Sequence, residues 1–166
     1  STQRLSLLGE LEEEDFKQRG PLNWGLDPNQ DRERDTNSFA IEYRTDISEN
    51  LTLAASGRYD DNSEFESTNT YRVEAVYQLS DSARLRSAYG TAVKNPTFSE
   101  RFGFYTNFIG NPNLEPEEST SWELGIDKQL GQLSLSVTLF DSKLDNEIDG
   151  FVYDPVTFGH TAGNKE

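Results

Sequence analysis

The stretch from residue 71 to residue 89, YRVEAVYQLSDSARLRSAY, decides the fold. Apolar and polar residues alternate on both sides of the polar turn Ser80-Asp81-Ser82. A period of two is typical of a β-strand whose faces meet different surroundings. The stretch therefore predicts two antiparallel strands joined by a short turn. The less polar face of this pair carries Tyr71, Val73, Ala75, Tyr77, Leu79, Leu85, Ser87 and Tyr89.

The same alternation continues outward from this stretch. It recurs in residues 5–11, 39–43, 51–59, 122–126 and 133–139. No long amphipathic helix stands out beside these segments. We expect all seven segments to be strands, because strict alternation does not fit a helical period.

Short and long connections between these segments alternate along the chain. Polar turns occupy 46–50, 80–82 and 128–132, and longer connections occupy 15–37, 60–68 and 93–119. In an up-and-down meander, all long connections then lie at one end and all short turns at the other. This asymmetry is typical of outer-membrane barrels. The sequence therefore predicts an all-β antiparallel meander that forms part of a transmembrane β-barrel.

The chemistry of the two faces supports a barrel. One face is apolar with aromatic residues near the strand ends, as interfacial girdles have. The other face mixes charges of both signs, which suits a wet interior and would be costly in a dry core. The alternative is a soluble β-sandwich or jelly roll, which also alternates along its strands. The charged residues are Arg58, Arg72, Glu74, Arg84, Arg86, Glu123 and Asp127.

Composition excludes several classes of protein. The 166 residues carry a formal net charge of -15, which disfavours a nucleic acid partner. The chain has no Cys and one His, so thiol chemistry and the usual zinc or haem sites are excluded. No apolar run approaches the roughly 20 residues of a transmembrane helix. His160 stands alone in an expected loop with no catalytic motif beside it, so we expect no enzyme.

A family resemblance rests on residues 87–100, SAYGTAVKNPTFSE, and 110–119, GNPNLEPEES, followed by SWELG at 121–125. This succession resembles TonB-dependent outer-membrane receptors. There a strand ending in Tyr-Gly leads to a Lys-x-Pro loop, and a GNP-x-L-x-PE-x-S return opens the next strand. Residues 140–148 resemble the next hairpin, and 162–166 resemble the start of a strand that is cut off. Before Leu85 only the general pattern agrees.

The resemblance implies a barrel of roughly 22 strands with a plugged lumen. Residues 1–166 would be a partial barrel domain with about eight of these strands, without the plug domain or the TonB box. The chain begins at Ser1 and has no Met, so we expect a processed chain or a piece of a longer one. The location implied is the outer membrane of a Gram-negative bacterium.

The resemblance also implies function. Such receptors bind a scarce small molecule, for example an iron–siderophore complex or cobalamin, and import it with energy from the TonB complex. The implied partners are TonB, the plug domain of the intact receptor, the ligand and outer-membrane lipid. The function that would go with the β-sandwich is calcium-dependent binding of a carbohydrate or a protein.

Most residues of the family motif are expected to shape a loop rather than to perform chemistry. Asn95 is expected to cap a short helical turn with Pro96 at its first position. Gly110 allows a tight bend, and the later prolines restrict the return path. The motif residues expected to have this structural role are Lys94, Pro96, Gly110, Asn111, Pro112, Leu114, Pro116 and Glu117.

Two sets of loop residues are candidates for binding. Phe102, Phe104, Tyr105 and Phe108 crowd one long loop and could contact an amphipathic ligand, although packing within the loop is the simpler explanation. Asp27, Asn29 and Asp31 place oxygens at alternate positions, as calcium loops do. Arg32 stands where an EF-hand needs glycine, so a solvated acidic loop is the simpler explanation, and no other cofactor is expected.

The charged face has its own simple explanation. Arg72, Glu74, Arg84 and Arg86 would face the lumen on neighbouring strands. They could contact the plug, an anionic cargo or one another, and we expect mutual pairing.

Overall fold

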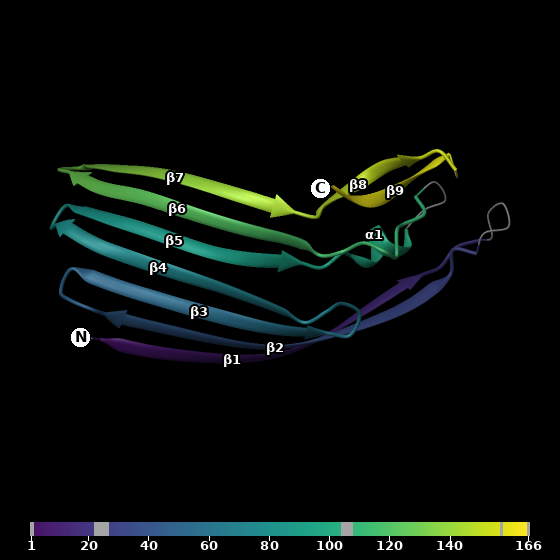
Figure 1. The fold of residues 1–166 in the computed structure, drawn as a ribbon, viewed down its shortest axis with the longest axis horizontal. Helices are drawn as coiled ribbons and strands as arrows, with labels where there is room; N and C mark the ends of the chain where they lie inside the picture. Colours follow the sequence, from purple (N-terminus) through teal and green to yellow (C-terminus); the bar gives the residue numbers. More distant parts are fainter. Residues whose placement is uncertain (1, 22–26, 104–107, 157, 166) are drawn as a thin grey trace.

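The computed structural model describes residues 2–21, 27–103, 108–156 and 158–165. Seven strands form one antiparallel sheet in sequence order, and two more form a separate hairpin (Figure 1). The sheet strands are β1 (Gln3–Gln18), β2 (Gln30–Asp46), β3 (Leu51–Asn62), β4 (Thr68–Ser80), β5 (Ala83–Lys94), β6 (Glu117–Leu130) and β7 (Leu133–Asp145). The hairpin is β8 (Glu147–Asp154) and β9 (Gly159–Lys165), and the short helix is α1 (Phe98–Phe102). Within the described ranges, no helix has the length and hydropathy needed to cross a bilayer.

The predicted meander is confirmed, with one correction to its extent. The described residues form nine strands, in agreement with the expected number of about eight. The predicted connection 15–37 is wrong, because β1 and β2 stay paired out to Gln18 and Gln30. The alternation of apolar and polar residues stops earlier in both strands. Their outer parts have polar residues on both faces, so the ladder continues where the hydrophobic signal does not.

Short turns and long connections lie at opposite ends of the sheet. The turns after β2, β4 and β6 are at one end, together with the N-terminus (Figure 1). The connections after β1, β3 and β5 are at the other end, and α1 and the β8–β9 hairpin lie there as well. We call these the turn end and the loop end. The long connections and the separate hairpin are thus collected at the loop end.

The ladder register places apolar residues on one face and charges on the other. Val73 lies opposite Tyr89, and Tyr89 lies opposite Trp122, so all three share the apolar face. Arg72 and Glu74 alternate with Val73 and therefore point to the opposite, polar face. The apolar face is open in this chain, and Val73 is 50% exposed.

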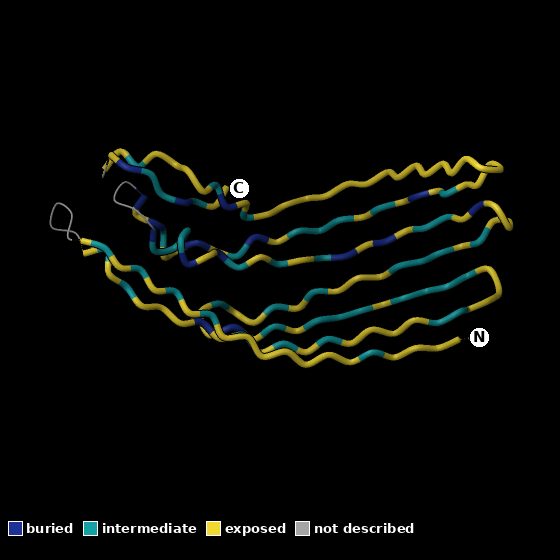
Figure 2. Tube along the Cα trace, turned by 180° about the vertical axis from the view of Figure 1, so that it is seen from behind, coloured by how far each residue is buried: buried dark blue, intermediate teal, exposed yellow. Residues whose placement is uncertain are grey.

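The soluble β-sandwich is therefore overturned. A sandwich would pack a second sheet against the apolar face at about 10 Å. The other described sheet is the β8–β9 hairpin, which lies beyond the loop end instead (Figure 1). Buried residues gather near the loop end, whereas β1 and β7 are mostly exposed (Figure 2). An open apolar face with a charged reverse is what a segment of a membrane barrel requires.

Two neighbouring leucines of β1 test the assignment of the faces in the intact barrel. Leu7 lies opposite Ile41 on the apolar face, and Leu8 lies opposite Ala40 on the polar face. Leu7→Arg should lower the free energy of unfolding in phospholipid by up to roughly 2–4 kcal/mol, the value for the middle of a bilayer. Leu8→Arg, the matched control, should change it much less. A urea titration measures the free energy of unfolding of both variants. An equal decrease of this free energy for the two variants would contradict the assignment of the faces.

Candidate functional site

An ion pair closes the base of the long connection 95–116. Lys94 and Glu117 are direct partners in the β5–β6 ladder, beyond the aromatic pair Tyr89 and Trp122, and Lys94 Nζ lies 2.7 Å from Glu117 Oε2. Glu117 Oε1 also accepts a hydrogen bond from the Ile148 N–H at 2.7 Å. The Lys94 ammonium lowers the pKa of Glu117 against the opposing effect of burial, and the Ile148 N–H adds to this lowering. One carboxylate thus joins β5, β6 and β8.

The helical turn of this connection starts later than expected. Thr97 is the N-cap: its Oγ1 accepts from the Glu100 N–H at 3.2 Å, and the Glu100 carboxylate accepts from the Thr97 N–H at 2.7 Å. This reciprocal pair is a capping box. The prediction of an Asn95 cap with Pro96 at the first helical position is therefore wrong. Pro96 is fully buried instead, and its carbonyl accepts a hydrogen bond from Arg34 at 2.9 Å.

The bend that ends the connection depends on two glycines. Gly110 has φ 62°, and an added Cβ would lie 2.4 Å from the backbone nitrogen of Gly103. Only glycine fits so close an approach with a left-handed backbone. The next residue, Asn111, donates its N–H to the Glu100 carbonyl at 2.8 Å and accepts from the Asn113 N–H at 3.0 Å. The Pro112 carbonyl accepts from Arg101 at 3.3 Å.

The β8–β9 hairpin packs on this connection. Phe108, Leu114, Ile148 and Ala162 form a small buried core, in which Phe108 is 3% exposed. Backbone contacts reinforce it: the Ile109 N–H donates to the His160 carbonyl at 3.0 Å. Phe108 is thus buried in this core, and its contact with a ligand stays a prediction. Phe104 and Tyr105 lie outside the described residues.

His160 does not lie in a loop, contrary to expectation. It belongs to β9, and its ring stacks on that of Phe151 with the centroids 4.2 Å apart. The Asn164 side chain of the same strand bonds to both the N–H and the carbonyl of Glu115. Pro116 follows Glu115 in the sequence and is half-buried. These contacts hold the hairpin against the return path of the connection.

Arginine and phenylalanine side chains form a cluster at the loop end, which we call the arginine–aromatic cluster. Arg34 is buried and donates to Glu14 at 2.6 Å, and its guanidinium lies 4.9 Å from the Phe98 ring centroid. Arg101 forms an ion pair with Glu64. The members of the cluster are Phe16, Arg32, Arg34, Phe65, Phe98, Arg101 and Phe102.

Arg32 differs from the other two arginines of the cluster. Its guanidinium lies 4.3 Å from the ring centroid of Phe102, and the side chain is exposed. Within the described ranges, no carboxylate pairs with it. The sequence interpretation missed Arg32 and Arg34 because it placed them in a loop. Both residues have even numbers, like the other residues on the polar face of β2. This alternation could have identified them as part of the strand.

The calcium candidates are engaged in protein contacts. The Asp27 carboxylate accepts from the Asn29 N–H at 2.9 Å and from its amide at 2.6 Å. The Asp31 carboxylate pairs with Arg19 at 2.8 Å, and Asn29 accepts from the Gly20 N–H at 3.0 Å. In the part of the chain that the structure describes, no three metal-binding side chains gather in one place. Calcium would have to displace these bonds, and its binding stays a prediction.

The polar face of the sheet carries ion pairs within strands and between strands. Arg72 lies 2.5 Å from Glu74 and 3.5 Å from Glu123. Arg84 and Arg86 both lie against Asp127, at 2.9 Å and 3.3 Å. The expected mutual pairing of these charges is confirmed. The polar face is thus a wall on which most charges are already neutralised.

The Gly110 bend can be tested by substitution in the intact protein. Gly110→Ala adds a Cβ to a left-handed residue in close contact with Gly103, so it should destabilise the 95–116 connection by roughly 1–3 kcal/mol. Hydrogen exchange of residues 108–116 should accelerate. Gly150→Ala is the control, because an added Cβ there meets nothing within 4 Å. Unchanged exchange in the Gly110 variant would show that the bend is not needed.

The Glu117 carboxylate predicts a pH dependence. Its pKa is lowered from the ordinary 4.5, so its stabilising contribution is complete above that value and is lost as the pH falls through the lowered pKa. Glu117→Gln should speed exchange of the Ile148 amide at pH 7 relative to the wild type. The difference between the two proteins should shrink at pH 3. A difference that persists at pH 3 would contradict the electrostatic explanation.

Comparison with known proteins agrees with this architecture. Residues 9–164 match the family described as TonB dependent receptor-like, beta-barrel. The structure is similar to the siderophore receptor PirA from Pseudomonas aeruginosa, with a TM-score of 0.82 and 21% identity over 98% of this chain and 30% of that one. PirA from Acinetobacter baumannii gives a TM-score of 0.77 and 22% identity over 98% and 28%.

Two further structures share the fold. A variant of the ferric enterobactin receptor PfeA from Pseudomonas aeruginosa, in complex with enterobactin, gives a TM-score of 0.80 and 18% identity over 98% of this chain and 29% of that one. The copper transporter OprC gives a TM-score of 0.68 and 14% identity over 82% and 25%. The chain thus spans less than a third of the length of these relatives. It is a segment of an outer-membrane barrel and belongs to the TonB-dependent receptor β-barrel family.

Proposed function

We propose that this chain is part of a receptor that captures an anionic iron–siderophore complex at the loop end and imports it. Energy would come from the TonB complex, and the plug domain of the intact receptor would gate the lumen. Membership of the family and the fold shared with siderophore receptors support this proposal. The import step is gated passage of a bound ligand without covalent chemistry.

The exposed guanidinium of Arg32 over the Phe102 ring carries the proposal. Arg34 and Arg101 already have the carboxylates of Glu14 and Glu64 as partners, whereas Arg32 has none in the described residues. A guanidinium held against an aromatic ring keeps its edge free for an anion. An anionic chelate with planar rings would use both the charge and the ring. Of the two described members of the predicted aromatic set, we therefore assign Phe102 to the ligand surface, because Phe108 is buried.

The electrostatics of the loop end limit the choice of cargo. The chain carries a net charge of -15, so an anionic ligand needs a local positive group to approach. Arg32 supplies such a group on the inward face of β2. A cargo without negative charge, the proposed alternative being cobalamin, would gain nothing from this arginine. A binding competition between a ferric siderophore and cobalamin on the intact receptor distinguishes these two cargo classes.

Substitution of Arg32 tests the proposal in the intact receptor. Arg32→Gln should weaken binding of a ferric siderophore about tenfold, the effect of one charge-assisted contact of about 1.4 kcal/mol. Lys17→Gln is the matched control, because Lys17 is an exposed cation of the same hairpin on its opposite face. Calorimetric titration in detergent measures both affinities. Equal affinities for the Arg32 variant and the wild type would contradict the proposed ligand surface.

A further inference from the structure

Arg34 is a buried arginine of β2 that bonds to a segment outside the sheet. Its side chain is 8% exposed. Glu14, its direct ladder partner on β1, accepts from Arg34 Nε at 2.6 Å and lies 2.6 Å from Nη2. Nη1 donates to the Pro96 carbonyl at 2.9 Å. All three guanidinium nitrogens are thus bonded, and the third joins β2 to the 95–116 connection.

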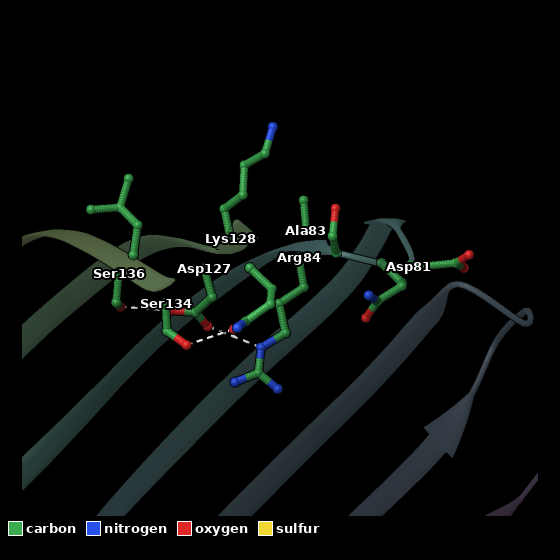
Figure 3. A pocket seen from close by; sticks show the side chains of 11 residues that line it. Asp81, Ala83, Arg84, Asp127, Lys128, Ser134 and Ser136 are labelled. Carbon is green, nitrogen blue, oxygen red and sulfur yellow. Dashed lines mark hydrogen bonds and ion pairs between the residues drawn. The ribbon is translucent and has the colours of Figure 1, made fainter. Parts of the chain in front are cut away.

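An arginine at the turn end shows what a similar pair does when it belongs to the sheet alone. Arg84 also pairs with its direct ladder partner, Asp127, and its Nε donates to that carboxylate at 2.9 Å (Figure 3). The Arg84 side chain is 56% exposed and has no partner outside the sheet among the described residues. Pairing with a carboxylate therefore explains neither the burial of Arg34 nor its bond to Pro96.

The polar face of β2 contacts the short helix α1 at both of its ends. Arg34 holds the Pro96 carbonyl, which directly precedes the N-cap of the helix. At the other end, Gln30 Nε2 donates to the Phe102 carbonyl at 3.1 Å, and the Arg32 guanidinium lies over the Phe102 ring. Residues 30, 32 and 34 share one face of the strand, because side chains alternate along it. The helix therefore lies along β2.

The aromatic rings pass the position of Arg34 on to Phe102. The Arg34 guanidinium lies 4.9 Å from the ring centroid of Phe98, the first residue of α1. Phe98 is buried and stacks on Phe16 of β1 at 5.5 Å and on Phe102 at 6.4 Å. A helix of five residues is not stable by itself. Its place on the sheet therefore depends on these contacts.

We propose that Arg34 is the positioning residue of the ligand surface: it fixes α1 on β2 and so places the Phe102 ring against the Arg32 guanidinium. Arg34 is buried with its nitrogens bonded, so it acts through Arg32 and not on the ligand. A guanidinium that already rests on a ring loses less conformational entropy when it binds an anion. The role in ligand binding rests on the proposed function, whereas the positioning of α1 does not.

Arg34→Lys in the intact, cargo-free receptor tests the positioning of α1. The single ammonium should stay with the Glu14 carboxylate and leave the Pro96 carbonyl, because the charge-assisted bond is the stronger one. Hydrogen exchange of residues 97–103 should become about fivefold faster, the equivalent of one hydrogen bond. Arg84→Lys is the matched control, since it changes the other direct arginine–carboxylate pair, and it should leave this exchange unchanged. Unchanged exchange in the Arg34 variant would overturn the inference.

A double-mutant cycle tests whether Arg34 acts through Arg32. Calorimetric titration with a ferric siderophore should show that Arg34→Lys weakens binding about fivefold when Arg32 is present. In the Arg32→Gln background the same change should weaken binding less than about twofold, because the contact that it supports is already lost. Arg84→Lys should change the affinity in neither background. Equal weakening by Arg34→Lys in both backgrounds would indicate a general role in folding of the loop end and would overturn the inference.

Failure of the siderophore proposal gives a different result. An unchanged affinity in the Arg32→Gln variant would contradict the proposed ligand surface. The exchange of residues 97–103 is measured without cargo and does not depend on that result. Faster exchange in Arg34→Lys would then still support the positioning of α1 by Arg34, and unchanged exchange would overturn it.

Discussion

The backbone of a strand within a bilayer must satisfy its hydrogen bonds inside the sheet, and the rest of this structure depends on that constraint. The seven sheet strands meet it with unbroken neighbour-to-neighbour pairing from β1 to β7. Pairing fixes the pleat, so successive side chains must face lipid and lumen in turn. Tyr71, Val73 and Tyr89 and the charged Arg72 and Glu74 therefore lie on opposite faces of one continuous surface.

The loop end is built differently because water replaces lipid there. The alternation of apolar and polar residues ends there, and individual contacts between side chains and backbone fix the position of the chain. The Lys94–Glu117 pair, the close approach of Gly103 and Gly110 and the small core around Phe108 fix the 95–116 connection against β8 and β9. Such an assembly gives a rigid support to the exposed face of the arginine–aromatic cluster.

The charges of the polar face are mostly used within the wall itself. Arg72, Arg58 and Arg86 have carboxylates on their own or neighbouring strands. In the described ranges, Arg32 at the loop end and Arg4 and Arg44 at the turn end have no carboxylate partner.

The sequence by itself determined the seven strands of the sheet, their order and the family, because a period of two and the GNP motif at residues 110–112 are local signals. It did not determine the β8–β9 hairpin. Nor did it determine the outer parts of β1 and β2, whose residues are mostly polar on both faces. Nor could it show that Phe108 is buried, that Thr97 caps α1 or that Arg34 reaches Pro96. Only the tertiary structure decided these, because each depends on segments far apart in sequence that the sheet brings together.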